Sequence, residues 1–220
     1  MKRTVKFFVL GLATIFALSA QAQESSWTAG VDLYSNYIWR GTKYGTGPAI
    51  QPSVKFNTGG LNIGVWGSFD SNGYTEVDPY ISYSFSNGLS LGLTNYYYPG
   101  SAAEGTSLFK EDANAYEINA GYTTGGLSLS ANYILNEAPI AASAGEDLYF
   151  QAGYAFEKFS LLVGAGDGWH TSDGEFNVCN IGIGTSKEIK ITDSFSIPVS
   201  GQVILNPERE QLYVVVGISL

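Results

Sequence analysis

The feature that most constrains the fold is an alternation of apolar and polar residues that continues through nearly the whole chain after Ser25. In the first stretch, Trp27 and Val31 share one parity, whereas Thr28 and Asp32 share the other. A period of two residues predicts β-strands with one apolar and one polar face. The expected strands fall at residues 27–40, 50–56, 61–70, 76–85, 89–94, 116–122, 127–133, 147–156, 159–165, 179–183, 195–203 and 212–220. We therefore predict an all-β chain of about twelve strands.

The connections between these strands alternate in length. A short set that is rich in turn-forming residues falls at 58–60, 87–88, 124–126, 157–158 and 192–194. A longer and more polar set falls near 41–47, 71–74, 99–113, 137–146, 168–174 and 206–210. Glycine in the short set supplies the positive φ that tight hairpin turns need. Short turns at one end and longer loops at the other predict an antiparallel up-and-down transmembrane β-barrel.

The first residues of the chain predict export. A basic start precedes an apolar stretch from Phe7 to Leu18, and Ala20-Gln21-Ala22 supplies a small-x-small cleavage pattern. This order is typical of a secretory signal peptide. We expect residues 1–22 to be the signal peptide and residues 23–220 to form an outer-membrane β-barrel.

The composition excludes several other classes of protein. Charged residues make up 14% of the chain, compared with about 25% in average soluble domains. There are 11 Lys+Arg against 20 Asp+Glu, and they do not cluster as in a nucleic-acid-binding protein. Repeated apolar spans of about 20 residues, which a helical membrane protein needs, are missing from the sequence. The one cysteine, Cys179, cannot form a disulfide within the chain, and we expect it to be a small apolar filler.

Aromatic residues suggest that the apolar face meets lipid. They gather near the ends of the expected strands on the apolar parity, which predicts two interfacial girdles. The expected girdle residues are Trp27, Trp39, Phe56, Phe69, Phe85, Tyr97, Tyr116, Tyr122, Phe156, Phe159 and Phe195. Trp27 and Trp39 would stand about 40 Å apart along one strand, and a strand tilt of roughly 40° would reduce this to about 30 Å of bilayer. A soluble β-sandwich would show the same alternation and is the alternative.

The order of several short motifs resembles the TorF family of porin-like proteins. The first motif is Ser35-Asn36-Tyr37-Ile38-Trp39-Arg40-Gly41. The others are Pro48-Ala49-Ile50-Gln51-Pro52, Gly64-Val65-Trp66-Gly67-Ser68, Glu76-Val77-Asp78-Pro79-Tyr80, Tyr97-Tyr98-Pro99-Gly100 and Tyr116-Glu117. The resemblance covers nearly the whole chain after residue 22. It implies an outer-membrane barrel with a channel role and names no substrate. The chain departs from the common barrel ending, because Leu220 stands where an aromatic residue is more usual.

The polar parity is expected to line the lumen. The expected pore-lining residues are Asp32, Asn36, Arg40, Lys55, Trp66, Asp70, Glu76, Asp78, Tyr80, Glu117, Asn132, Asp147 and Tyr149. Five of its carboxylates fall in the outer half of the barrel, with Arg40 as the one basic residue beside them: Asp70, Glu76, Asp78, Glu117 and Asp147. An acidic vestibule of this kind would concentrate cations and repel anions. Alternatively, Arg40 pairs with Glu76, Asp78 or Glu117 and braces a filled barrel.

Few groups suit catalysis or metal binding. The one histidine, His170, falls in an expected outer loop, and a solvated loop histidine is the simpler interpretation than a catalytic base. Asp70, Asn72 and Glu76 could offer oxygens to Ca²⁺, but their spacing lacks the full calcium-loop pattern. Tyr96-Tyr97-Tyr98 could stack on a sugar, although a girdle residue between two lumen tyrosines is the simpler interpretation. We expect no catalytic residue, metal or cofactor.

Together these patterns predict a passive channel in the outer membrane for small hydrophilic solutes or ions, mildly selective for cations. Its expected partners are outer-membrane lipid and the barrel-assembly machinery, which would contact the C-terminal strand; nucleic acid is not expected. Bulky inward residues such as Trp66, Tyr80 and Tyr149 support an alternative, a non-conducting barrel that acts in binding or envelope structure through its outer loops. An enzyme that uses His170 and a soluble periplasmic β-protein are further alternatives.

Overall fold

The computed structural model describes residues 25–99, 111–141 and 143–220. The expected signal peptide and residues 100–110 of the longest expected loop lie outside this part of the chain. The described helices are short 3-10 turns: η1 (Glu111–Ala113), η2 (Pro139–Ala141) and η3 (Gly168–His170). None of them has the length and apolarity that a membrane-crossing helix requires.

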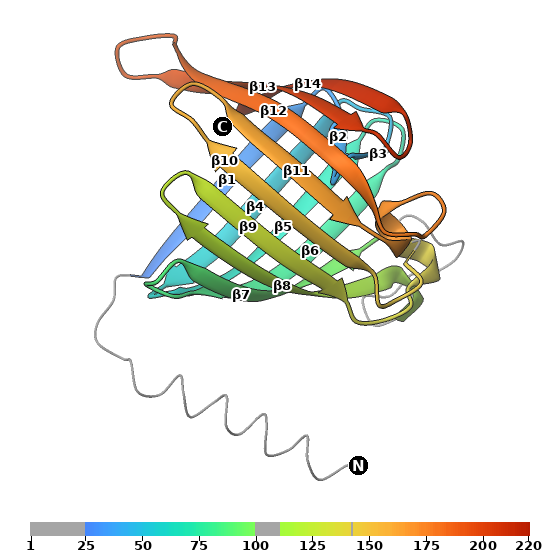
Figure 1. Cartoon of the computed structure of the whole chain (residues 1–220). Coiled ribbons are helices and arrows are strands. Elements are labelled where there is room, and N and C mark those ends of the chain that lie inside the picture. The colour runs from blue at the N-terminus through green and yellow to red at the C-terminus, as the bar shows by residue number, and fades with distance from the viewer. Residues whose placement is uncertain (1–24, 100–110, 142) are drawn as a thin grey trace.

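Twelve strands close into one antiparallel barrel, which confirms the predicted fold class (Figure 1). Each strand pairs with its neighbours in the chain, and β14 returns to β1 to close the ring. The barrel strands are β1 (Ser25–Tyr34), β4 (Ala49–Thr58), β5 (Leu61–Asp70), β6 (Thr75–Ser84), β7 (Leu89–Tyr97), β8 (Asn114–Thr124), β9 (Leu127–Ile134), β10 (Leu148–Ala155), β11 (Ser160–Gly166), β12 (Asn177–Lys190), β13 (Ser196–Asn206) and β14 (Gln211–Ser219). Full closure pairs strands that would otherwise form open edges.

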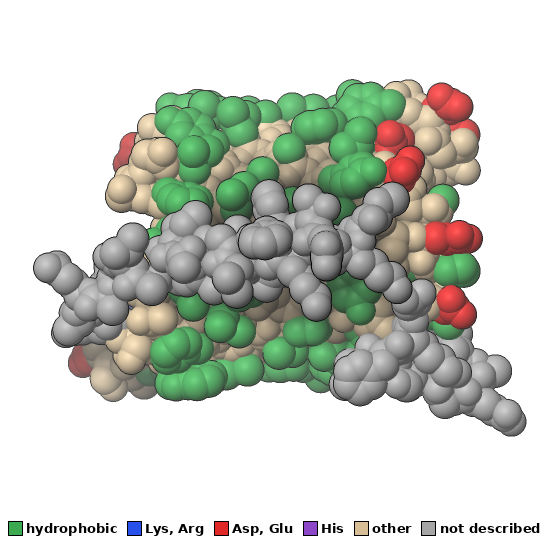
Figure 2. All heavy atoms as spheres, turned by 90° about the horizontal axis from the view of Figure 1, so that it is seen from below, with side chains coloured by type: hydrophobic (Ala, Val, Ile, Leu, Met, Phe, Trp, Pro, Cys, Tyr) green, Lys and Arg blue, Asp and Glu red, His purple; other side chains and the backbone are tan. Residues whose placement is uncertain are grey.

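Apolar side chains cover the outside of the barrel wall. Leu91, Ile63 and Val214 are 53%, 46% and 64% exposed, although each belongs to a regular strand. Figure 2 shows the hydrophobic side chains as a band between two rims, with Asp and Glu side chains at the rim that carries the longer loops. An apolar band of this kind on a closed barrel is the arrangement that suits lipid on the outside.

Most of the expected girdle residues stand on this outer face. The most exposed are Trp27, Phe85, Tyr122, Phe156, Phe159 and Phe195. Phe56, Phe69 and Tyr116 are half-buried. Tyr97 is an exception, because only 6% of it is exposed.

The first expected strand, residues 27–40, is wrong in its second half. Strand β1 ends at Tyr34, and a separate hairpin follows, made of β2 (Tyr37–Trp39) and β3 (Thr42–Tyr44). Its two-residue turn has positive φ at both Arg40 (50°) and Gly41 (82°), which is the pattern of a type I′ turn. The alternation continues across the bend between β1 and β2, so parity alone could not reveal the break. Trp27 and Trp39 therefore do not measure the thickness of a bilayer along one strand.

Strand β12 also differs from its expected form. It extends from Asn177 to Lys190, whereas the alternation marked only residues 179–183. The pairing with β11 shifts register between Gly164 and Ala165, and Cys179 is left without a partner across the ladder. A bulge of this kind moves a residue off the regular parity. Cys179 is consequently fully buried and unpaired as a thiol, instead of lying on the outer face with Ile181.

The closing pair of strands, β1 and β14, has fewer paired residues than any other pair of neighbouring barrel strands. Strand β1 pairs along its whole length with β4, from Ser25 to Tyr34. Its ladder with β14 pairs Asp32–Tyr34 with Gly217–Ser219, and Val31 and Leu220 exchange backbone hydrogen bonds of 3.1 and 2.9 Å at one end of it. At the other end the backbone N–H of Ser35 donates to the carbonyl of Val216 at 2.8 Å, and the N–H of Val216 donates to Ser35 Oγ at 3.0 Å.

Candidate functional site

The β2–β3 hairpin, which we call the plug hairpin (residues 36–46), lies inside the barrel at the end with the longer loops (Figure 1). Its tip reaches the barrel wall at strands β12 and β13, three and two strands away from β1 around the ring. A Cβ atom at Gly41 would lie 1.9 Å from the carbonyl oxygen of Cys179 on β12, so only glycine fits there. Asn206 on β13 donates from Nδ2 to the carbonyl of Gly41 at 3.1 Å. The backbone of the hairpin tip thus rests on strands β12 and β13.

A buried ion pair fixes the same tip to β8. Arg40 Nη1 and Nη2 donate to Glu117 Oε1 and Oε2 at 2.6 and 2.9 Å. Glu117 is fully buried and also accepts hydrogen bonds from Tyr96 Oη at 2.8 Å and Asn119 Nδ2 at 2.6 Å. A two-pronged guanidinium–carboxylate pair adds geometric specificity to its strength. The bracing pair that the sequence left open among three carboxylates is therefore Arg40 with Glu117.

The guanidinium of Arg40 also lies between two aromatic rings. Its Cζ atom is 4.4 Å from the ring centre of Trp39 and 4.4 Å from that of Tyr149. Burial opposes the charge, but the neighbouring Tyr96 and Glu117 side chains outweigh burial and raise the pKa of Arg40. A non-glycine residue at positive φ is uncommon, and here Arg40 adopts that backbone to place its side chain in the pair.

Aromatic rings fill the space around the tip. The Trp39 ring lies 5.2 Å from Tyr96, 5.0 Å from Trp169 and 5.3 Å from His170, measured between ring centres. These side chains come from the hairpin, from β7 and from η3, three segments that are far apart in sequence. Trp39 therefore belongs to an interior cluster, and its expected place in the outer girdle is wrong. The alternation put it on the apolar parity of a strand that does not continue that far.

His170 is buried rather than solvated, contrary to the expectation for a loop histidine. It is 1% exposed, and its Nε2 atom lies 3.4 Å from Arg40 Nη1. Because arginine can only donate, this contact makes Nε2 the acceptor and places the ring proton on Nδ1. Burial, and then the positive charge of Arg40, lower the pKa of His170 to about 2. Within residues 25–99, 111–141 and 143–220, Nδ1 has no hydrogen-bond partner, so no acid–base pair of the catalytic kind forms there.

Acid is expected to loosen the plug hairpin through this histidine. The pKa of His170 is about 2 with the hairpin in place and near 6.5 once its surroundings are wet. The closed arrangement is therefore fully stable above pH 6.5 and loses about 1.4 kcal/mol for each pH unit below it. Between pH 6.5 and pH 4.5 the released fraction should rise roughly 100-fold. Tryptophan emission, which shifts to the red when Trp39 meets water, measures this release; His170→Gln should remove most of the pH response, and an unchanged response would contradict the assignment.

A second acidic group lies on β6. Glu76 and Asp78 are 1% and 4% exposed. Three tyrosine hydroxyls donate to Glu76: Tyr74 at 2.5 Å, Tyr98 at 3.1 Å and Tyr37 of the hairpin at 3.5 Å. The expected vestibule carboxylates of β6 and β8 thus lie in the interior, but tyrosines and Arg40 surround them in place of open water.

The other two expected vestibule carboxylates, Asp70 and Asp147, accept hydrogen bonds from residues of the loops. Asp70, at the end of β5, accepts hydrogen bonds from the N–H groups of Thr46, Asn72 and Tyr74 at 2.7, 2.8 and 2.9 Å. It therefore holds the base of the plug hairpin and does not converge with Glu76 on a calcium site. Asp147 is 3% exposed and accepts a hydrogen bond from Ser143 at 2.5 Å. In the described part of the chain, no cluster of three or more His, Cys, Asp or Glu side chains could hold a metal ion.

The remaining expected lining residues have mixed surroundings. Lys55 is exposed, and Asp32 is half-buried. Trp66 packs against Tyr37 of the hairpin, with 5.4 Å between ring centres. Tyr80 lies across Gly64 on the neighbouring strand. Asn36 belongs to the hairpin and not to the barrel wall.

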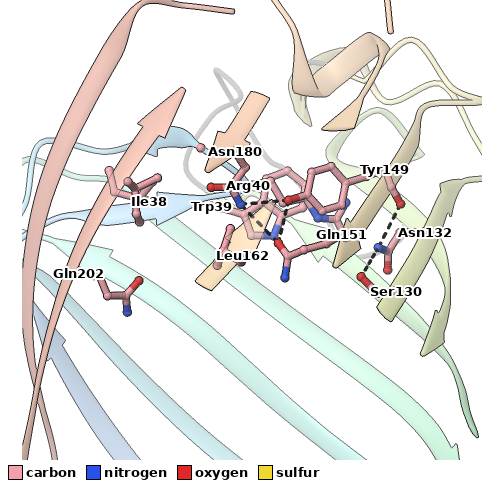
Figure 3. Close-up of a pocket in the computed structure, with 12 residues that line it drawn as sticks. Ile38, Trp39, Arg40, Ser130, Asn132, Tyr149, Gln151, Leu162, Asn180 and Gln202 are labelled. Carbon is pink, nitrogen blue, oxygen red and sulfur yellow. Dashed lines mark hydrogen bonds between the residues drawn. The ribbon is translucent and has the colours of Figure 1, made fainter. Parts of the chain in front are cut away.

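A cavity of about 340 Å³ lies beneath the hairpin tip (Figure 3). Its lining residues come from the hairpin and from strands β9 to β13: Ile38, Trp39, Arg40, Gly41, Ser130, Asn132, Tyr149, Gln151, Leu162, Asn180, Gln202 and Ile204. Asn180 Nδ2 donates to Tyr149 Oη at 3.0 Å and to Gln151 Oε1 at 3.3 Å. Asn132 Nδ2 donates to the carbonyl of Tyr149 at 3.3 Å. The sequence reasoning found Arg40, Asn132 and Tyr149 but missed the other amides, although the lumen parity of Gln151 and Gln202 was visible in the alternation.

Comparisons with known proteins identify a bacterial family and weak structural similarities. A mutant of the Rhodopseudomonas blastica porin is similar at 15% identity, with a TM-score of 0.40, over 78% of this chain and 55% of the porin. A multiple mutant of the same porin matches over 90% of this chain and 99% of its own, at 12% identity and a TM-score of 0.42. The chain thus spans about half the length of the first of these structures. No curated protein matches this sequence. The model of a family described as "Bacterial protein of unknown function (Gcw_chp)" matches residues 19–195, and the chain belongs to this family.

Proposed function

We propose that this protein is an outer-membrane, porin-like channel for small hydrophilic solutes, closed by its plug hairpin and opened when that hairpin leaves the lumen. One observation carries the proposal: the hairpin crosses the barrel interior, and the Arg40–Glu117 pair fixes its tip to the far wall. Among the described residues, the segment that crosses the lumen in this way is a short one between β1 and β4. The plug hairpin is short enough to leave the lumen without breaking the pairing of the barrel strands.

The apolar outer face supports a membrane location. Every barrel strand carries at least one exposed large apolar side chain. A contiguous apolar surface of this kind is unfavourable in water. The resemblance to the TorF family adds the expectation of a channel role. The outer membrane is the compartment in which closed barrels of this type are found.

Inward small residues support passage below the plug. Toward the end with the short turns, the inner wall carries Ser90, Gly92, Gly121, Ser128 and Gly153. Such side chains occupy little of the lumen. The hairpin and the aromatic cluster around it therefore form the main described obstruction.

Cation selectivity would belong to the open state. When the hairpin leaves, the charge of Arg40 leaves with it, while Glu117, Glu76 and Asp78 remain on the wall. Acidic groups in a confined opening attract cations and repel anions. The mild cation preference expected from the sequence would therefore appear only after release of the hairpin.

A non-conducting barrel is the second candidate, acting in binding or envelope structure through its outer loops. The observation that favours it is the complete hydrogen bonding of Glu117, which receives two bonds from Arg40 and one each from Tyr96 and Asn119. A fully satisfied buried network stabilises a single arrangement. In that case the hairpin would be a permanent brace.

Single-channel conductance in a planar bilayer separates the two candidates. Residues 36–46 are replaced by a short Gly-Ser linker, which can close the gap because position 47 lies beside the Ser35 carbonyl. The wild-type barrel should be closed most of the time, and the variant should conduct steadily with a reversal potential that favours cations. Shortening the turn at 192–194, at the opposite end, is the matched control and should leave conductance unchanged. A folded linker variant that stays silent would refute the gated channel and support the brace.

A further inference from the structure

We propose that the cavity beneath the plug hairpin binds a neutral, hydroxyl-rich solute of one or two sugar rings. The cavity volume of about 340 Å³ is at the small end of the range of about 300–1,000 Å³ for ligand pockets. This inference names a class of solute for the channel proposed above. It rests on that proposed function only in taking the bound solute to be one that the channel carries. Binding itself is measured without any conduction.

The lining of the cavity is uncharged apart from one compensated group. Amides from four strands and a serine hydroxyl supply polar atoms to it, and the described residues that line it include no Asp, Glu or Lys side chain. Arg40 is the one charged lining residue, and both of its terminal nitrogens already donate to Glu117. A charged solute would lose its hydration here and gain no free counter-charge. A neutral solute pays no such cost.

Several polar groups of the cavity have hydrogen-bonding capacity left. The amide of Gln202 makes no hydrogen bond to any residue of the described chain, so both its oxygen and its nitrogen are free. Gln151 uses Oε1 as an acceptor from Tyr149 and Asn180, which leaves its Nε2 donors. Figure 3 shows Gln202 on one side of the cavity and Ser130 on the other, with Gln151 between them. A hydroxyl group both donates and accepts, so a polyol can satisfy amide oxygens and amide nitrogens alike.

Apolar surface lies next to these polar groups. Ile38, Leu162 and Ile204 line the cavity together with the edge of Trp39. Sugar rings present C–H groups between their hydroxyls, so they match a lining in which amides and apolar side chains alternate. An unsubstituted ion or a purely polar solute would leave this apolar surface without a partner.

The site is divided between the hairpin and the wall. Ile38, Trp39 and Arg40 belong to the hairpin, whereas Gln151 and Gln202 belong to β10 and β13. A solute that contacts both parts binds the closed arrangement better than the open one. By linkage it must then hold the hairpin in place.

Isothermal titration of the refolded barrel with three ring-sized probes tests the inference. Glucose is neutral, glucosamine is cationic and gluconate is anionic, and all three are of similar size. Glucose should bind saturably and the two charged probes at least tenfold more weakly. Gln202→Ala removes the free amide without breaking a described hydrogen bond and should lower glucose affinity about tenfold. Ser53→Ala, an inward position on β4 outside the cavity lining, is the matched control and should not change it.

Two results would overturn the inference. One is the absence of saturable glucose binding by the folded wild-type barrel, and the other is tighter binding of gluconate or glucosamine than of glucose. The linker variant of the hairpin gives an independent check, because it lacks half of the site and should lose glucose binding. If that variant conducts but still binds glucose, the gate stands and the site assigned here is wrong. If it is silent and does not bind, the site stands and the channel is refuted.

Discussion

The Arg40→Ala variant is expected to conduct for a large part of the time under conditions in which the wild-type barrel is closed. The substitution removes both hydrogen bonds to Glu117 and the contact of the guanidinium with the rings of Trp39 and Tyr149. Removing one partner of a buried ion pair costs roughly 3–5 kcal/mol, because the other charge remains buried without compensation. The open population should therefore rise about 100-fold or more. Single-channel recording of the open time measures the change directly.

Three companion variants make this result specific. Glu117→Gln should also open the barrel, since it leaves the Arg40 charge buried without its partner. Arg40→Lys should rescue little, because an ammonium cannot form the two-pronged contact. Lys43→Ala removes an exposed charge from the same hairpin and should have no effect. Normal closure by Arg40→Ala, with the barrel folded, would show that the aromatic cluster alone holds the plug.

The Gly41→Ala variant should prevent the hairpin tip from seating at all. The added methyl group would lie 1.9 Å from the carbonyl oxygen of Cys179 and 2.9 Å from its carbonyl carbon. These are backbone atoms of the barrel wall, so they cannot turn aside as a flexible side chain would. The φ of 82° adds a penalty of about 1–2 kcal/mol for a residue with a Cβ. We expect constant conductance, together with a red shift of tryptophan emission as Trp39 becomes wet.

Gly73 provides the matched control for this variant. Its φ is 94°, and a Cβ there would meet no atom within 4 Å. Gly73→Ala therefore carries the backbone penalty of positive φ without the clash. The Gly73→Ala barrel should therefore be closed as often as the wild-type barrel in conductance recordings. Equal effects of the two substitutions would mean that backbone strain, and not the contact with β12, explains the result.

The strands of the barrel wall could be predicted from the sequence because they all follow the same two-residue alternation. Side chains point in turn to lipid and to the lumen along each strand, so apolar and polar residues alternate in the sequence at nearly every position. The plug hairpin follows a different rule. Its parity depends on the bend after Tyr34 and on the type I′ turn at Arg40 and Gly41. An Arg-Gly pair is a weaker hairpin signal than Asn-Gly, so Trp39 was assigned to the wrong face.

The candidate site is formed by contacts between residues that are far apart in the sequence. Such contacts leave no pattern among neighbouring residues. The sequence named Glu117 as one of three possible partners of Arg40, and only the path of the hairpin selects it. The bulge at Cys179 shifts the parity of β12, and the Cys179 carbonyl lies directly against Gly41. His170 looked like a loop residue because its burial comes from Arg40, Trp39 and Tyr149, which are distant in sequence. Long-range packing of this kind leaves no periodic trace.

The short pairing of β1 with β14 has a consequence for the order of events during assembly. Strand β14 follows the other barrel strands in the chain and meets β1 across a short seam, in which Asp32–Tyr34 pair with Gly217–Ser219 and Val31 is hydrogen-bonded to Leu220. Ser35, the first residue after that seam, is bonded through its backbone and its hydroxyl to Val216 of β14. Because Ser35 leads directly into the hairpin, we expect the hairpin to take up its final path only after the ring has closed. A nascent barrel would pass through a stage in which its wall is complete and its lumen still unobstructed, and the plug would be the last element to reach its place.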